Sequence, residues 1–148
     1  MAKIVSINVS EKKGVVKVPV DKATLKINHG IVNDAHAGNW HRQISLLAKE
    51  SIDKMRERGF DHLKFGDFAE NITTEGINVY KLPIGTRLTL GEFKVEVTQI
   101  GKKRHGGCEI KRTTGDCVMP RECIFVKVIS GGTINIGDEV KILKESMF

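Results

Sequence analysis

The chain has 148 residues, 40% of them hydrophobic, and its 24 Lys and Arg against 18 Asp and Glu give a formal net charge of +6. A chain of this length and apolar content buries one sizeable core, so we expect a single domain over residues 1–148 that needs no disulfide or structural metal. Its apolar stretches fall far short of the about 20 residues of a spanning helix, which excludes a transmembrane protein of that kind.

The first predicted elements are two strands. Residues 3–9 alternate, with Val5, Ile7 and Val9 on one face, and residues 15–20 repeat this pattern. The N-terminal stretch lacks the apolar core and the small-residue cleavage site of a secretion signal. We therefore expect the chain to stay in the cytoplasm, where its three cysteines stay reduced.

One helix is predicted from Gln43 to Arg58, with Gly59 as its C-terminal cap. Apolar side chains recur there at helical spacing, namely at Ile44, Leu47, Ala48, Ile52 and Met55. Leu47 and Ile52 are expected to face the barrel. A short second helix is predicted near residues 65–71.

The second half of the chain is predicted to be mostly strands, separated by glycine turns. The predicted strands cover residues 87–90, 93–100, 124–129 and 139–143. Segments 82–90 and 134–142 resemble each other, because each has an Ile-Gly turn that leads into a strand. Many short strands with glycine turns are typical of a closed or nearly closed barrel. The predicted fold is therefore mainly β, a β-barrel with one main α-helix and short helical segments.

Positive charge is concentrated in one stretch. Residues 102–112 carry five Lys and Arg against Glu109, which is 5 − 1 = +4 of the chain's +6. A focused basic patch indicates a small anion or a reactive thiolate, and a solvated basic loop is the alternative. The non-periodic stretch 101–121 is long enough to predict a functional loop.

Cys108 lies inside this basic stretch, directly after His105-Gly106-Gly107. Neighbouring positive charge favours the thiolate, which is the form that accepts sulfur or attacks an electrophile. Burial as a small apolar side chain is the alternative. Cys117 and Cys123 are expected to pack against apolar neighbours. His105 with the three cysteines supplies the residue types of a zinc site but no Cys-x-x-Cys pair, so we predict no metal site.

Two polar segments flank the predicted helix. Residues 30–43 include Asp34, His36 and His41, which together with Arg42 could bind a metal or a phosphate or could equally anchor a loop. Residues 66–76 include Glu70 and Asn71 in a turn-like context.

Four ordered motifs resemble those of the MOSC domain, a family named for the C-terminal domain of molybdenum cofactor sulfurase. They are Asp34-Ala35-His36-Ala37-Gly38 with Arg42-Gln43-Ile44-Ser45-Leu46-Leu47, Glu70-Asn71-Ile72-Thr73, Leu82-Pro83-Ile84-Gly85, and Gly115-Asp116-Cys117-Val118-Met119-Pro120-Arg121-Glu122. The resemblance covers nearly the whole chain, and the last motif is similar to the small stand-alone bacterial members. It implies a barrel of the MOSC or pyruvate-kinase-barrel-like type.

The resemblance also implies a function. MOSC proteins are thought to accept sulfur on a cysteine from a pyridoxal-phosphate cysteine desulfurase or to bind molybdenum cofactor, with molybdenum enzymes or cofactor-biosynthesis proteins as further partners. In much of the family the sulfur-carrying cysteine aligns with Arg104 of this chain. Cys108, four residues on, is therefore the predicted acceptor, with Cys117 as the alternative.

The cofactor-binding residues predicted with this resemblance are Asp34, His36, Arg42, Glu70, Asn71, Lys102, Arg104 and Arg121. The alternative function is a binding module for molybdopterin or a partner enzyme, without covalent sulfur transfer. A barrel that binds RNA is a third interpretation, which the shortage of aromatic residues near the basic stretch disfavours.

Overall fold

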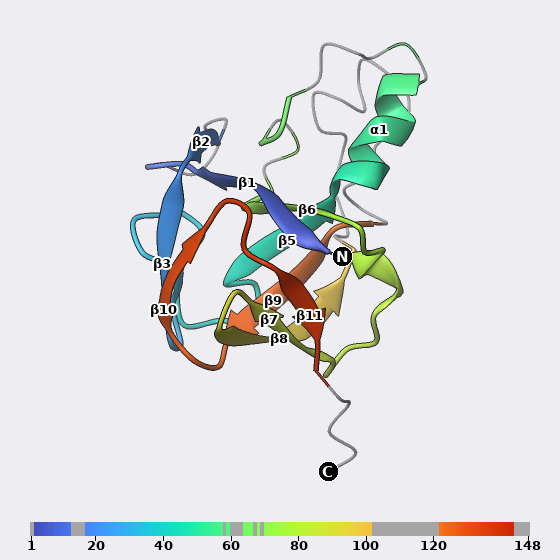
Figure 1. Ribbon diagram of the computed structural model, residues 1–148. Helices are drawn as coiled ribbons and strands as arrows, with labels where there is room; N and C mark the ends of the chain where they lie inside the picture. The colour runs from blue at the N-terminus through green and yellow to red at the C-terminus, as the bar shows by residue number, and fades with distance from the viewer. Residues whose placement is uncertain are drawn as a thin grey trace.

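The computed structural model describes residues 2–12, 17–57, 59, 64–66, 68, 70–101 and 122–143. The strands of this part of the chain form two sheets (Figure 1). The larger sheet has the strand order β11-β7-β8-β9-β5-β6-β1-β2, with bounds β1 Lys3–Val9, β2 Val18–Val20, β5 Ile44–Ala48, β6 Ile72–Glu75, β7 Arg87–Leu90, β8 Phe93–Ile100, β9 Ile124–Val128 and β11 Val140–Ile142. The smaller sheet has the order β10-β3-β4, with bounds β3 Lys22–Lys26, β4 Gly30–Ile31 and β10 Gly132–Asn135.

The larger sheet curls until β1 meets β11. An antiparallel bridge joins Lys3 to Glu139, and the Ile4 amide donates to the Asp138 carbonyl oxygen at 2.9 Å. The Val140 amide donates to the carbonyl oxygen of Ala2, also at 2.9 Å. These contacts join β1, the strand next to the end strand β2, to the opposite end of the sheet at β11, so the predicted mainly β barrel is confirmed.

The barrel core is apolar and includes side chains from both sheets. Its fully buried members include Ile4, Ile7, Ile44, Leu46, Ile72, Leu88, Val95, Val97, Ile124 and Val126. Strand β1 departs from the simple alternation that the sequence predicted, because its pairing register with β6 shifts between Ile4 and Ser6. As a result Ile4 and Ile7 are both fully buried, whereas Val5 is only half-buried.

The predicted helix 43–58 is wrong in its first third. Residues Ile44–Ala48 form strand β5, which pairs parallel to β6 and antiparallel to β9, and helix α1 covers only Lys49–Glu57. All five residues of β5 are buried, since both faces of this strand are covered. A short, fully apolar strand gives the same pattern as a buried helical turn, and strand pairing decides between them here.

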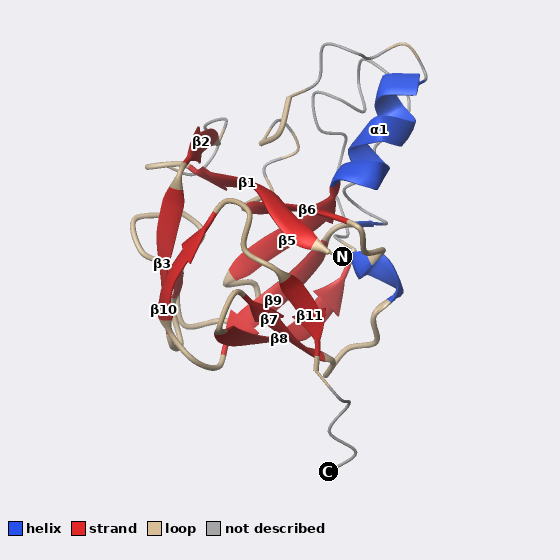
Figure 2. Cartoon of the chain, in the orientation of Figure 1, coloured by secondary structure: helices blue, strands red, loops and turns tan. Residues whose placement is uncertain are grey.

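A second, smaller core lies between β5 and α1, which stands outside the barrel (Figure 2). It consists of Leu47, Ile52, Met55, Phe68, Cys123 and Phe125, with Phe65 packed against it. Leu47 therefore lies on a strand and faces α1 rather than the barrel interior, which corrects the predicted orientation. The predicted burial of Cys123 is confirmed, with no exposed surface.

No helix forms in the described residues between 65 and 71, where Phe65, Gly66 and Phe68 lie in turns. The predicted second helix is therefore wrong for this part of the segment. A 3₁₀ turn that the sequence did not predict, η1, covers Val79–Lys81, and strands β3, β4, β6 and β10 were also not predicted. No helix of the described chain is long and apolar enough to cross a membrane.

The internal similarity of segments 82–90 and 134–142 has a structural counterpart. Gly85 and Gly137 both have φ +94°, which favours glycine. Each glycine amide donates at 2.8 Å to the backbone of a neighbouring strand, and the strands that follow, β7 and β11, pair with each other. The two turns therefore contribute equivalent corners to the barrel.

The second core generates a stability prediction. Leu47→Ala should lower the free energy of unfolding by about 2–5 kcal/mol, because it removes buried methyl groups and leaves a cavity between β5 and α1. Urea unfolding measures this loss. Ile84→Ala, at a side chain that is 65% exposed, is the control and should cost less than about 0.5 kcal/mol. A loss at Leu47 as small as that at Ile84 would contradict the assignment of this second core.

Candidate functional site

Buried polar side chains gather where β1, β5 and β6 meet the loop that follows β4. We refer to them as the polar cluster, and each is at most 6% exposed: Ser6, Asn8, Ser10, Lys17, Asp34, Ser45, Glu70, Asn71 and Thr73. Buried polar groups are costly unless they are hydrogen-bonded, so the contacts within the cluster decide what holds it.

A buried ion pair joins Lys17 to Asp34. The Lys17 ammonium lies 2.8 Å from Asp34 Oδ1, and the two side chains are 1% and 0% exposed. Lys17 Nζ also lies 3.3 Å from Ser10 Oγ and 3.0 Å from His36 Nδ1, so each of its three protons has an acceptor. Because an ammonium only donates, we assign Nδ1 of His36 as the acceptor and the ring proton to Nε2.

Asp34 also fixes the backbone around it. Its Oδ1 accepts from the Ser10 amide at 3.1 Å and its Oδ2 from the His36 amide at 3.2 Å. Burial by itself would raise the pKa of the Asp34 carboxyl, but the hydrogen bond and the charge of Lys17, with hydrogen bonds from Ser10 and Asn71, outweigh burial and lower it. Asp34 therefore stays ionised and ties its loop to the end of β1.

Asn71 connects two strands through its side chain. Its Oδ1 accepts from the Ser45 amide at 3.0 Å, and its Nδ2 donates to the Asn8 carbonyl oxygen at 3.2 Å. The Asn71 side chain also helps to lower the pKa of Asp34, and the Asp34 carboxylate accepts from the His36 amide, so the predicted residues Asp34, His36 and Asn71 lie together at this cluster. Asn71 thus acts within the polar cluster as a link between β5, β1 and the loop.

Glu70 is fully buried, and only one of its two carboxylate oxygens has a hydrogen-bond partner in the described chain. Its Oε2 accepts from the Gly66 amide at 3.0 Å and from the Thr73 hydroxyl at 2.8 Å, whereas its Oε1 has no hydrogen-bond partner in the described chain. Burial raises the pKa of this carboxyl, and the bonds from Gly66 and Thr73 only partly offset the effect. Gly66 is required beside it, because it has φ +95° and an added Cβ would lie 2.9 Å from the Lys17 carbonyl oxygen.

Arg42 belongs to a second group that lies at the end of β8. Its guanidinium lies 5.9 Å from the Trp40 ring centroid and 5.4 Å from that of Phe125, and its Nε donates to Gln99 Oε1 at 3.0 Å. The same Gln99 oxygen lies 2.9 Å from His41 Nε2. In the described chain the two terminal nitrogens of Arg42 carry no hydrogen bond, so their donors are available to a ligand.

The loop of residues 32–43 links the two groups. The Trp40 indole Nε1 donates to the His36 carbonyl oxygen at 2.9 Å, and the Ala35 amide donates to the Ser10 carbonyl oxygen at 2.8 Å. The polar cluster therefore holds one end of this loop, and the loop carries Arg42 at its other end.

Several predicted site residues fall in the stretch 102–121. Cys108, Cys117, Lys102, Arg104 and Arg121 lie outside the described residues. The described residues on either side are joined, since the Gly101 amide donates to the Cys123 carbonyl oxygen at 2.6 Å. Gly101, the last described residue before this stretch, accepts from Gln99 Nε2 at 2.8 Å and so lies beside the Arg42 group.

The other side of this corner is held by Glu122. Its Oε1 accepts from the Ser51 hydroxyl at 2.6 Å and from the Lys54 ammonium at 2.9 Å. The hydrogen bond to Glu122 raises the pKa of Lys54. Helix α1 thereby anchors the point where the chain enters β9.

The sequence did not single out Lys17, Trp40 or Gln99. Lys17 was expected on the polar face of a strand, yet it is 3% exposed. Two features of the sequence pointed weakly to these residues. Lys17 is a polar residue within an apolar alternation, and Gln99 is a glutamine near the end of a predicted strand. No group of three or more His, Cys, Asp or Glu that could hold a metal occurs in the described ranges.

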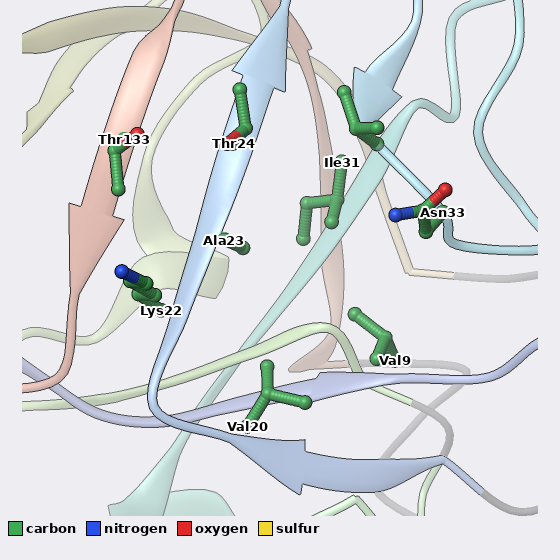
Figure 3. A pocket seen from close by; sticks show the side chains of 9 residues that line it. Val9, Val20, Lys22, Ala23, Thr24, Ile31, Asn33 and Thr133 are labelled. Atoms are coloured by element: carbon green, nitrogen blue, oxygen red, sulfur yellow. The ribbon is translucent and has the colours of Figure 1, made fainter.

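A cavity of about 380 Å³ lies elsewhere, between β1, β2 and the smaller sheet (Figure 3). Its apolar lining includes Val9, Val20, Ala23 and Ile31. None of the predicted site residues lines it, so it is separate from both groups described above.

Comparison with known proteins agrees with this fold. Residues 33–103 match the family model described as MOSC domain. The YuaD protein from Bacillus subtilis has a similar structure, with a TM-score of 0.72, 17% identity and coverage of 96% of each chain. YiiM from Geobacillus stearothermophilus gives a TM-score of 0.71 and 18% identity, over 99% of this chain and 77% of that one.

YiiM from Escherichia coli is also similar, with a TM-score of 0.65 and 17% identity, over 99% of this chain and 71% of that one. At such identities the structural likeness shows the fold, and the family model adds a match over residues 33–103. A comparison with curated proteins found no match. The residues that match the MOSC domain model, 33–103, include both Asp34 and Arg42.

The ion pair generates a second prediction. Asp34→Asn should lower the free energy of unfolding by about 3–5 kcal/mol, because it leaves the Lys17 ammonium buried without an opposite charge. The double variant Lys17→Met with Asp34→Leu should recover part of this loss, since it leaves no buried charge. Urea unfolding of the three proteins measures both effects.

Asp53→Asn is the matched control for this prediction, because the Asp53 side chain is 35% exposed in its pair with Lys49. Breaking such a pair should cost less than about 1 kcal/mol. Equal losses for Asp34→Asn and Asp53→Asn would show that burial of the Lys17–Asp34 pair does not matter.

Glu70 generates a pH prediction. Because burial raises the pKa of Glu70 in the folded protein above its ordinary value of 4.5, the folded state binds this proton more tightly than the unfolded state. The contribution of Glu70 to stability is therefore present at low pH and is lost as the pH rises through the folded pKa. Glu70→Gln should remove this loss, so its stability relative to the parent protein should increase with pH. Urea unfolding measures the free energy of unfolding of both proteins. A difference between Glu70→Gln and the parent that stays constant from about pH 5 to pH 8 would contradict this pH dependence.

Proposed function

We propose that the protein binds molybdenum cofactor at a site that includes Arg42 and accepts sulfur on Cys108 for delivery to that cofactor or to a metal–sulfur centre. A MOSC domain is associated with molybdenum cofactor, and residues 33–103 of this chain match the MOSC domain model. The observation that carries the proposal is the Arg42 group, whose unused guanidinium donors lie near Gly101, the residue that precedes the basic stretch in the sequence.

The Arg42 group suits the chemistry of this cofactor. Molybdopterin carries a phosphate and a planar pterin ring. The terminal nitrogens of an arginine form a fork that matches phosphate oxygens, and the Trp40 ring, 40% exposed, offers a flat apolar face next to it. In the proposal the basic side chains of Lys102, Arg104 and Arg121 add positive charge around the phosphate.

The polar cluster has a different part in the proposal. Most polar atoms of Asp34 and Asn71 are already engaged within the protein. We therefore assign to Asp34 and Asn71 the role of fixing the loop that carries Arg42. Their direct contact with a cofactor stays a prediction. Within the cluster we assign to ligand contact the Glu70 Oε1 atom, which has no hydrogen-bond partner in the described chain. The predicted contact of His36 with a cofactor stays a prediction.

The sulfur step needs only a thiolate and a persulfide donor. The Cys108 thiolate attacks the terminal sulfur of a persulfide on the partner desulfurase, a pyridoxal-phosphate enzyme. One S–S bond forms at Cys108 while the S–S bond of the donor breaks, and the donor cysteine leaves as a thiolate. No net oxidation occurs. Positive charge at Lys102, Lys103 and Arg104 stabilises the attacking thiolate.

The second candidate is a binding module without sulfur transfer, which serves molybdopterin or a partner enzyme. The residue at position 104 favours it, because arginine stands where much of the family has its sulfur-carrying cysteine. In that case Arg104 and Arg42 together contact the anion.

Mass spectrometry under non-reducing conditions distinguishes the two candidates. After incubation with a cysteine desulfurase and cysteine, the parent protein should gain the mass of one sulfur atom, and Cys108→Ser should not. The melting temperature of Cys108→Ser should stay close to that of the parent. Cys117→Ser is the matched control and should still gain the sulfur.

Two other results would change the assignment. A persulfide that persists in Cys108→Ser but disappears in Cys117→Ser would move the acceptor to Cys117. A protein that gains no sulfur on any cysteine but binds molybdopterin, with a loss of affinity in Arg42→Ala, would contradict sulfur transfer and support the binding module.

A further inference from the structure

Gln99 occupies an irregular position on strand β8. The register between β8 and β9 shifts between Val97 and Gln99, which places a bulge at Thr98. The Thr98 hydroxyl contacts the carbonyl oxygens of His41 and Phe125. Bulges redirect the side chains next to them, and here the bulge brings Gln99 toward the loop that carries Arg42.

Three contacts fix the orientation of the Gln99 amide group. Its Oε1 accepts from Arg42 Nε at 3.0 Å and meets His41 Nε2 at 2.9 Å, and its Nε2 donates to the Gly101 carbonyl oxygen at 2.8 Å. Reversing the amide would place a donor against the Arg42 guanidinium and an acceptor against a carbonyl. Gln99 therefore holds its oxygen toward Arg42.

This contact decides which part of Arg42 a ligand meets. Nε is used by Gln99, and the rings of Trp40 and Phe125 lie 5.9 and 5.4 Å from the guanidinium carbon. The remaining edge, with the two terminal nitrogens, has no hydrogen bond among the described residues. That edge presents two parallel N–H donors, which can bind two oxygens of a tetrahedral oxyanion at once.

We propose that Gln99 is a positioning residue, which orients Arg42 so that its two terminal nitrogens bind a tetrahedral oxyanion at the carboxyl end of β8. The chemical class is a phosphate or a phosphate ester, so the inference rests on the proposed function and names the group of the ligand that Gln99 helps to bind. Gln99 acts through Arg42 and does not itself touch the anion.

Binding of inorganic phosphate and of guanosine 5′-monophosphate to the full chain tests this inference. Gln99→Leu should weaken binding of both probes by about fivefold, because it removes one hydrogen bond that holds the fork. Tighter binding of the nucleotide than of phosphate would identify a phosphate ester as the ligand, since its planar base can stack on Trp40. Equal binding of the two probes would identify the free ion.

A second readout in the ligand-free protein separates positioning from a general structural effect. In the parent protein the Arg42 Nε proton should exchange slowly with solvent by NMR, and Gln99→Leu should speed this exchange. Gln99→Glu keeps an acceptor for Arg42 Nε but turns its second oxygen toward the Gly101 carbonyl, so exchange should be slower than in Gln99→Leu and faster than in the parent. Phosphate binding should stay weak because a carboxylate now lies beside the anion. Thr89→Val on neighbouring β7 is the neutral control and should change neither readout.

The outcomes are distinguishable from those of the proposed function. If Gln99→Leu leaves both Nε exchange and phosphate affinity unchanged while Arg42→Ala loses phosphate, the positioning inference is overturned and cofactor binding stands. If molybdopterin does not bind but phosphate does and depends on Gln99, the inference stands and the proposed cofactor is wrong. If phosphate binding does not depend on Arg42, the fork itself is wrong.

Discussion

The buried pair of charges on Lys17 and Asp34 is the interaction on which the arrangement of the candidate site depends. Removing two charges from water is costly, and here every proton of the ammonium has an acceptor while both carboxylate oxygens are bound. Such a pair forms only in one geometry. It holds the loop after β4 against the end of β1. The position of this loop determines where Arg42 lies, and Arg42 donates to Gln99 at the end of β8.

The sequence predicted those parts of the fold in which alternation and glycine turns agree. Strands β7, β8, β9 and β11 were found within one or two residues, because each has one face in the core. Strand β5 was missed because it is buried on both faces, so its five apolar or small residues matched the helical spacing of the helix that follows. Only its pairing with β6 and β9 distinguishes the two, and pairing is not visible in a local window.

The candidate site was predictable in part. Asp34, His36 and Asn71 were singled out by their motifs, and the structure brings them together in one cluster. Lys17 and Gln99 were not, because their roles arise from contacts across 17 and 57 residues of chain. Gln99 depends on a bulge at Thr98, whose position follows from strand pairing rather than from residue type. The predicted residues of the stretch 102–121 stay predictions.

Native-state hydrogen exchange tests the central claim most directly, because two amides report on Asp34 alone. The amides of Ser10 and His36 donate to its carboxylate. We expect both to be protected at neutral pH, and to lose protection as Asp34 is protonated on lowering the pH, before the barrel amides of β8 do so. The lowered pKa of Asp34 places this loss below the ordinary value of 3.8. Unprotected amides at neutral pH, or protection lost only together with that of β8, would contradict the claim that this ion pair holds the loop.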